Sequence, residues 1–123
     1  MREVEALIVQ PGPGVILAVE LKRVSTLLNV EDAAGMRRLD PRAPLGLEVV
    51  ERGSDRVGLL DGPGPPTVLY LGTVLGMETI SARELVALPP WLAKLMSPAL
   101  QPAVLPRGEK VVWLLNLDTL TKV

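Results

Sequence analysis

The amino-acid sequence predicts a mainly β fold, built from short strands around an aliphatic core. The chain of 123 residues contains 11 glycines and 12 prolines, and this density of helix breakers favours short strands joined by turns. Hydrophobic residues make up 48% of the chain but aromatic residues only 2%, so we expect a core of aliphatic side chains. The length predicts a single domain over residues 1–123, divided into two small β lobes.

One stretch near the C-terminal end, KVVWLLNLDTL at 110–120, gives the clearest strand signal. Val111 to Leu115 form an unbroken apolar run that is rich in β-branched and aromatic residues. Such a run is typical of a strand that is buried on both faces. We therefore expect this strand to have a neighbour on each side, to lie centrally in the fold and to place Trp113 in the core.

The first part of the chain predicts a β-hairpin. Two apolar segments, 4–9 and 15–21, flank the sequence PGPG at 11–14. Proline restricts φ and glycine accepts positive φ, so these residues suit a tight turn. The next segment, 22–28, fits either one helical turn or a continuing strand. The polar stretch 29–42 is expected to be an irregular loop.

The remaining chain predicts further short strands, separated by a second Pro/Gly turn and by short helices. The expected strands are 57–60, 67–71, 73–80 and the final strand that contains Trp113. Ser81 and Glu84 form an S-x-x-E capping box, which predicts a short helix that ends at Pro89. Residues 91–96 are expected to form another helical turn. Pro102 and Pro106 exclude the segment around them from a central position in the sheet.

The composition excludes several classes of site. The chain has no cysteine and no histidine, which removes thiol chemistry, the commonest general base and the commonest metal ligand. The net charge is −1, without the basic excess of nucleic-acid binders, so we expect no nucleic-acid partner. No apolar stretch approaches the roughly 20 residues of a membrane helix, and Glu3 and Glu5 replace the basic start of a signal peptide. We therefore expect no membrane insertion and a cytoplasmic protein.

Candidate catalytic groups are few. The GPGPP sequence at 62–66 is glycine-rich, but its three prolines lack the N–H donors that phosphate binding needs. Lys22 precedes Ser25 by three residues, as in a catalytic Ser–Lys pair, but this spacing is mostly coincidental. The side chains of the adjacent Glu31 and Asp32 point in different directions, so they make a poor metal site. We expect no catalytic, cofactor-binding or metal-binding residue. The alternative is a small β-barrel that binds a ligand or acts as an enzyme through carboxylate, Ser or Lys groups.

Two features could instead contact a partner protein. Leu21, Val24 and Leu28 share a face at helical spacing, and such residues either pack in the core or line a groove for a partner helix. Packing in the core is the commoner of these two roles. Trp91 follows two prolines at a predicted loop-to-helix corner, where a tryptophan often stays partly exposed and anchors an interface.

Several segments carry a family resemblance through their order and spacing. VLGMETISARELVALPPW (74–91) matches an apolar strand, a polar turn and a proline corner, and GEKVVWLLNLDTL (108–120) matches a last strand. Upstream, VILAVELKRVSTLL (15–28) matches a strand and its following turn, and Arg52-Gly53 with VGLLD (57–61) matches a degenerate NLRG element. In this order the segments resemble the CheW-like family, the adaptor domains of bacterial chemosensory arrays.

This resemblance implies a fold. CheW-like domains are pairs of small SH3-like β-barrels with short helices. Here 67–71 runs directly into 73–77, where the family has a glycine turn and a return strand, so one barrel is expected to lack a strand. The short form is similar to the FrzB-type accessory member of the Frz chemosensory system.

The resemblance also implies a non-catalytic adaptor that couples a receptor to other CheW-like or kinase components. The family holds the receptor's cytoplasmic signalling tip in an apolar groove near the Arg-Gly element, which here implicates Val24, Leu28, Arg52 and Gly53. Trp91 is a further expected partner-binding residue, based on its position after two prolines and not on the resemblance. The chemoreceptor tip and other CheW-like proteins are the expected partners, and the loss of a strand makes the histidine kinase regulatory domain the least supported one. An unpaired strand edge also favours a homodimer.

Overall fold

The computed structural model describes residues 3–121, and within them nine strands form the sheet. In chain order these strands are β1 (Glu3–Gly12), β2 (Val15–Glu20), β3 (Val24–Asn29), β4 (Arg37–Leu39), β5 (Arg56–Leu60), β6 (Thr67–Ser81), β7 (Val86–Ala87), β8 (Leu100–Arg107) and β9 (Lys110–Leu115). The helices are short: η1 (Leu21–Arg23), η2 (Val30–Ala33), η3 (Ala82–Glu84), α1 (Pro90–Ala93) and α2 (Leu117–Thr121). None of the described helices has the length and apolar character to cross a membrane. The predicted mainly β class is confirmed.

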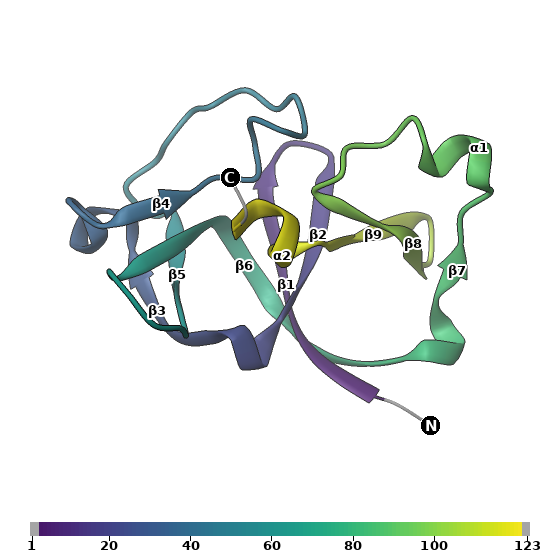
Figure 1. The fold of residues 1–123 in the computed structure, drawn as a ribbon, viewed down its shortest axis with the longest axis horizontal. Coiled ribbons are helices and arrows are strands. Elements are labelled where there is room, and N and C mark those ends of the chain that lie inside the picture. Colours follow the sequence, from purple (N-terminus) through teal and green to yellow (C-terminus); the bar gives the residue numbers. More distant parts are fainter. Residues whose placement is uncertain (1–2, 122–123) are drawn as a thin grey trace.

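The strands form two lobes along one hydrogen-bonded path (Figure 1). The path runs β3-β5-β6-β1-β2-β9-β8-β7, with β4 beside β6. The first lobe comprises β3, β4, β5 and residues 67–72 of β6; the second comprises β1, β2, β7, β8, β9 and residues 73–81 of β6. Neighbours are antiparallel except in the pairs β2–β9 and β4–β6. Since β3 and β7 end the path, the described strands form an open sheet rather than closed barrels.

The long strand β6 belongs to both lobes. Its first part pairs with β5, and its second part pairs with β1. The predicted direct run of 67–71 into 73–77 is therefore confirmed as one strand of 15 residues. Gly72 permits the crossing, because its φ is +73° and a Cβ there would lie 2.5 Å from the carbonyl oxygen of Gln10. Any side chain at this position would collide with the backbone of β1.

The alternation of side chains along the strands divides the buried residues into three clusters. The first-lobe core consists of Val30, Ala33, Val57, Val68 and Tyr70. The second-lobe core consists of Ala6, Ile8, Ala18, Ile80, Leu105 and Val112. The interlobe core consists of Leu7, Val9, Leu17, Val19, Leu39, Leu69, Leu71, Ala99, Leu115, Leu117 and Leu120. A strand in either lobe therefore sends alternate side chains into its own lobe and into the interface between the lobes.

This arrangement explains the unbroken apolar run in β9. As predicted, β9 has neighbours on both sides, β2 and β8. Val112 lies in the second-lobe core and Leu115 in the interlobe core, so the strand is buried on both faces. Trp113 is only half-buried at the margin of the interlobe core, and Val111 is 42% exposed. β9 is the sixth of the eight strands on the path, whose middle is occupied by β1 and β2, so the predicted central position is wrong.

Other predictions about the N-terminal half are met in part. β1 and β2 form the predicted hairpin. Residues 22–28 divide between η1 and β3, so each alternative holds for part of the segment. The prediction that 29–42 is an irregular loop is wrong, because the stretch contains η2 and β4. β4 forms by parallel pairing with residues 67–69 of β6, a tertiary contact that the local sequence does not reveal.

The capping box at Ser81 is present, but it begins only a short turn. The Ser81 hydroxyl accepts the Arg83 N–H at 3.3 Å, and the Glu84 carboxylate accepts the Ser81 N–H at 2.9 Å. The resulting helix η3 ends at Glu84, because Val86–Ala87 pairs with β8. β8 contains Pro102 and Pro106 and has only this two-residue strand on its outer side, so the prolines lie near the sheet edge as predicted. Helix α2 was not predicted.

Candidate functional site

Val24 and Leu28, two of the predicted partner-binding residues, lie on β3 at the edge of the first lobe. Both are half-buried. Val24 packs against the interlobe core, whereas Leu28 packs against the first-lobe core. The backbone here is extended, so the helical spacing assumed for a row of anchors is wrong. The two side chains contribute mainly to packing, in two different clusters.

Arg52 and Gly53 form an exposed turn in segment 40–55, which contains no strand. Asp55 closes this turn through both its backbone and its side chain. Its N–H donates to the Arg52 carbonyl at 3.0 Å, and its Oδ2 accepts the Arg52 N–H at 2.8 Å. The same Oδ2 accepts the Tyr70 hydroxyl at 2.6 Å, and the Asp55 carbonyl accepts the Val30 N–H at 3.1 Å. The turn is therefore fixed to both β6 and η2.

Arg42 fixes the same segment at a second point and is 0% exposed. Its Nε and Nη2 donate to the Asp40 carboxylate at 2.9 and 2.6 Å, and its Nη1 donates to the Val50 carbonyl at 3.0 Å. Its guanidinium carbon lies 3.5 Å from the centroid of the Tyr70 ring. Segment 40–55 is thus held by side chains instead of by strand pairing. Sequence patterns alone do not reveal this cluster; its signals are Asp40 two residues before Arg42 and a lone tyrosine within an aliphatic strand.

The titratable groups of this cluster keep fixed protonation states. Burial alone would raise the pKa of Asp40, but hydrogen bonds from Arg42 and its positive charge outweigh burial and hold that pKa below its ordinary value. Burial, together with the hydrogen bond to Asp55, raises the pKa of Tyr70 to about 12. Neither group changes its protonation near neutral pH, which suits a structural anchor better than general acid–base catalysis.

A cavity of about 350 Å³ lies beside the Arg52 turn. Pro11 and Pro13 of the β1–β2 hairpin line one part of it, and Val50, Arg52 and Tyr70 line another. Among the described residues, the Arg52 side chain has no hydrogen-bond or ion-pair partner. Its positive charge is therefore available to a group that enters from outside.

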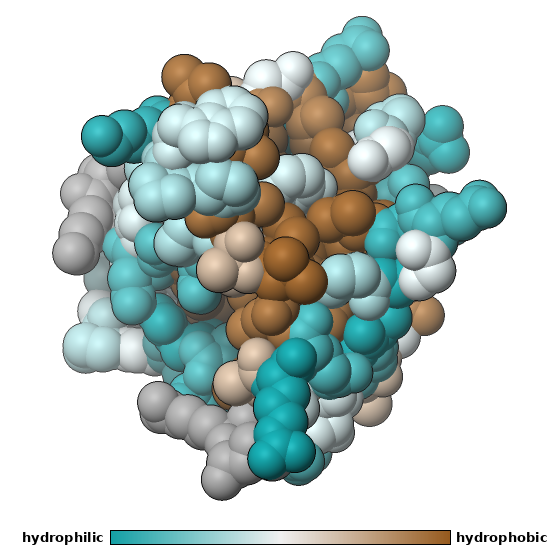
Figure 2. All heavy atoms as spheres, turned by 90° about the vertical axis from the view of Figure 1, so that its right-hand side faces the viewer, coloured by the Kyte–Doolittle hydropathy of each residue, from teal (hydrophilic) through white to brown (hydrophobic). Residues whose placement is uncertain are grey.

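Trp91 lies on the second lobe, in α1, and is 67% exposed, as its position after two prolines predicts. The neighbouring Leu95 is 77% exposed, and Val86 of β7 is also exposed. Figure 2 shows this side of the second lobe, where a band of hydrophobic residues crosses the surface between hydrophilic margins. In Figure 1, α1 and β3 lie at opposite ends of the molecule, so the structure does not bring Trp91 together with Val24 and Leu28.

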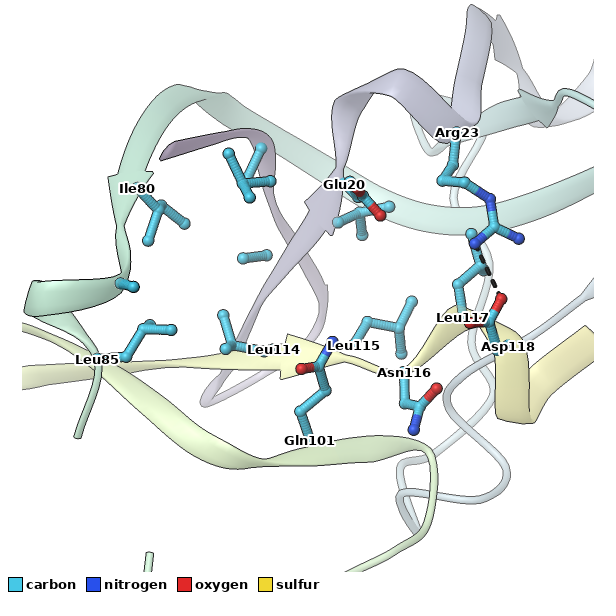
Figure 3. Close-up of a pocket in the computed structure, with 15 residues that line it drawn as sticks. Glu20, Arg23, Ile80, Leu85, Gln101, Leu114, Leu115, Asn116, Leu117 and Asp118 are labelled. Carbon is cyan, nitrogen blue, oxygen red and sulfur yellow. Dashed lines mark hydrogen bonds and ion pairs between the residues drawn. The ribbon is translucent and has the colours of Figure 1, made fainter. Parts of the chain in front are cut away.

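A second cavity, of about 330 Å³, opens into the second lobe (Figure 3). Ile80 and Leu85 lie at one end of it, and the ion pair between Arg23 and Asp118, with an N–O distance of 3.0 Å, lies at the other. Gln101 extends toward the cavity from β8. The small side chains of Ala6, Ala18 and Ala82 leave this end of the lobe unfilled. A single alanine in each of two apolar strands, Ala6 in β1 and Ala18 in β2, was the available sequence signal for it.

The candidate catalytic groups do not come together. Lys22 forms an ion pair with Glu20 at 3.0 Å, and the Ser25 hydroxyl donates to the Leu59 carbonyl at 3.2 Å, so the two residues are not a Ser–Lys pair. The described residues contain no group of three or more acidic side chains placed to hold a metal ion. The GPGPP sequence at 62–66 forms the expected turn between β5 and β6.

Comparison with known proteins identifies the fold. No protein-family model matches the chain. No curated protein matches it either. Among solved structures, the chain is similar to the crystal structure of the scaffolding protein TtCheW from Thermoanaerobacter tengcongensis, with a TM-score of 0.73 and 11% sequence identity. The match covers 99% of this chain and 94% of that chain. The chain therefore has the fold of a CheW scaffolding protein.

Proposed function

We propose that the protein is a non-catalytic adaptor of a bacterial chemosensory signalling array. The observation that carries this proposal is the fold match, which extends over nearly the whole length of both this chain and a CheW scaffolding protein. Sequence segments that resemble the CheW-like family are distributed along the same length. The proposal concerns binding alone, and no residue is assigned a catalytic role.

The surface of the protein supports such a role. The exposed Arg52–Gly53 turn stands on a segment anchored by Arg42 and Asp55, so it presents an unpaired positive charge from a fixed position. The second lobe presents a separate hydrophobic surface that includes Trp91. Two separate surfaces are what a scaffold needs to hold two partners at once.

The partners that fit this proposal are the cytoplasmic signalling tip of a chemoreceptor and a second CheW-like protein. Arg52, Gly53 and the neighbouring edge of the first lobe, with Val24 and Leu28, would contact the receptor. Trp91 would contact the second CheW-like protein. The continuous strand Thr67–Ser81, in place of two strands joined by a turn, supports the short, FrzB-type branch of the family, for which direct binding of the histidine kinase is the least supported interaction. The same proposal includes a homodimer that forms through an unpaired strand edge.

Titration of the purified protein with cytoplasmic fragments of the receptors from its own cell tests this function. Saturable binding of at least one receptor fragment is the expected result. Failure to bind any receptor fragment and any CheW-like protein of that cell would reject the proposal.

A second candidate function is the binding of a small, mainly apolar molecule, favoured by the cavity in the second lobe, whose lining is mostly aliphatic with polar groups at one end. Titration with an apolar fluorescent dye tests it, with Ala18→Leu as the variant that fills the cavity. Dye binding that this variant abolishes would support a ligand site. Equal dye binding by both proteins would exclude the cavity as its location.

A further inference from the structure

We propose that Tyr70 is a positioning residue for partner binding: its hydroxyl, acting through the Asp55 carboxylate, fixes the direction in which Arg52 is presented. This inference rests on the proposed adaptor function, because it concerns the same Arg52–Gly53 surface. It adds a buried residue to that surface, one that no partner would touch directly.

Tyr70 and Arg52 share one hydrogen-bond acceptor. A single oxygen, Oδ2 of Asp55, accepts both the Tyr70 hydroxyl at 2.6 Å and the Arg52 N–H at 2.8 Å. Asp55 is 7% exposed and Tyr70 is buried, so water does not readily replace either bond. Hydrogen bonds to a carboxylate are stronger than those between neutral groups, and more so in a buried site. The position of the Arg52 backbone therefore depends on the Tyr70 hydroxyl.

The other restraints on this turn act on the residues before and after the Arg52 N–H. No strand pairing is present between residues 40 and 55. Arg42 holds the segment at the Val50 carbonyl, two residues before Arg52, and the Asp55 backbone holds it afterwards. Glu51, the residue before Arg52, forms ion pairs with Arg38 and Arg42. At Arg52 itself, among the described residues, the bond from its N–H to Asp55 is the one hydrogen bond to a side chain.

The Tyr70 ring is itself held in place. The guanidinium of Arg42 lies over one face of the ring, and the ring belongs to the first-lobe core. A residue held in this way keeps its hydroxyl oxygen in one place, so Tyr70 transmits the rigidity of β6 to the turn. Removing only the hydroxyl leaves the ring, its packing and its contact with Arg42 unchanged.

The test is a double-mutant cycle on binding of a receptor cytoplasmic fragment. The variants are Tyr70→Phe, Arg52→Ala and the pair together, with Val68→Ala as a matched control from the same strand and the same core cluster. We expect Tyr70→Phe to weaken binding about fivefold to tenfold, the effect of one hydrogen bond. In the Arg52→Ala background the same change should have no effect, because its action passes through Arg52. Val68→Ala should lower the stability of the fold more than Tyr70→Phe does but change the affinity less.

The outcomes separate this inference from the proposed function. The positioning role is overturned, while the adaptor function stands, if Tyr70→Phe binds the fragment as tightly as the wild type. It is also overturned if the effects of Tyr70→Phe and Arg52→Ala on the binding free energy are additive. An equal loss of affinity in Val68→Ala would overturn it too, since the cause would then be general destabilisation. If the wild-type protein binds no fragment, the adaptor function and this inference fail together. Should Tyr70→Phe not fold, Asp55→Asn removes the shared carboxylate instead and is expected to show the same dependence on Arg52.

Discussion

The guanidinium carbon of Arg42 lies 3.5 Å from the centroid of the Tyr70 ring, and both residues are buried. A desolvated cation over an aromatic face is stabilised by about 2 kcal/mol. Asp40 neutralises the same guanidinium, so the burial of its charge is compensated. This stacked pair joins the strandless segment 40–55 to the long strand β6.

Replacing Arg42 by methionine should strongly destabilise the fold. The substitution removes the guanidinium partner of the Asp40 carboxylate, which keeps only the Arg42 backbone N–H among the described donors, and frees the Val50 carbonyl. The expected loss is about 3–5 kcal/mol of unfolding free energy, typical of a broken buried ion pair. Urea denaturation measures it. Arg83→Met at an exposed position is the control and should change stability by less than about 0.5 kcal/mol. A loss of similar size in both variants would contradict the anchoring role of Arg42.

Tyr70 should make the fold less stable at alkaline pH. The folded chain raises the pKa of Tyr70 from its ordinary value of 10.0 to about 12, so it holds the phenolic proton more tightly than the unfolded chain does. The resulting stabilisation is complete below the unfolded pKa and is lost as the pH rises through the folded pKa. Tyr70→Phe should lack this pH-dependent component in urea unfolding. Because the chain contains a single tyrosine, tyrosinate absorbance reports Tyr70 alone, and a midpoint near the ordinary value would refute the assignment.

Gly72→Ala should be more damaging than Gly14→Ala. Both glycines have positive φ, of 73° and 77°, so alanine is strained at either position. The strain alone costs about 1–2 kcal/mol. At position 72 the new Cβ also meets the β1 backbone, whereas at position 14 it meets nothing within 4 Å. Overpacking brings the expected loss at position 72 to about 3 kcal/mol. Equal losses in thermal or urea unfolding would show that β1 and β6 can separate freely at Gly72.

Charge reversal at Arg52 should weaken receptor binding without unfolding the protein. The Arg52 side chain is exposed and unpaired within the described residues, so Arg52→Glu removes no internal contact. We expect at least about a tenfold loss of affinity, equivalent to about 1.4 kcal/mol. Arg83→Glu, on the second lobe, is the matched charge reversal and should bind like the wild type. Equal weakening by both would indicate a response to net charge instead of a defined site.

The two tryptophans should separate binding from stability. Trp91 is exposed, so Trp91→Ala should change the free energy of unfolding by less than about 0.5 kcal/mol. It should weaken binding of a second CheW-like protein, because exposed tryptophans often dominate interfaces. Trp113 packs against the interlobe core, so Trp113→Ala should destabilise the fold by about 3 kcal/mol. Analytical ultracentrifugation and urea denaturation measure the two effects, and unchanged binding by Trp91→Ala would remove this surface from the proposal.

Much of the fold was predictable because local patterns and tertiary structure agree. The apolar run 111–115, the hairpin around 11–14 and the continuous extension through 67–80 all became strands in the expected places. Strand β4 was not predictable, because Arg37–Leu39 is polar at two of its three positions and is extended only through pairing with β6. Helix α2 was hidden for a similar reason: Leu117 and Leu120 turn back into the interlobe core, a contact that the short sequence does not specify.

The candidate site was less predictable than the fold. The exposure of Trp91 followed from the prolines before it. Val24 and Leu28 were judged at a helical spacing that the extended β3 does not have. The cluster of Arg42, Tyr70 and Asp55 depends on segments 15 or more residues apart, and no local pattern marks an arginine that will be completely buried. A single sequence shows which side chains carry charge but not which of them will find a partner.

The continuity of β6 has a consequence for how the molecule loses its structure. Because one backbone strand supplies pairing partners on both sides of Gly72, melting of either half is expected to destabilise the other. Denaturation is expected to be a single cooperative transition, and a fragment cut at the midpoint of the chain should not be an independent module. A force applied to one end of this strand is transmitted to the other end through covalent bonds. A force on one partner surface would therefore reach the opposite surface.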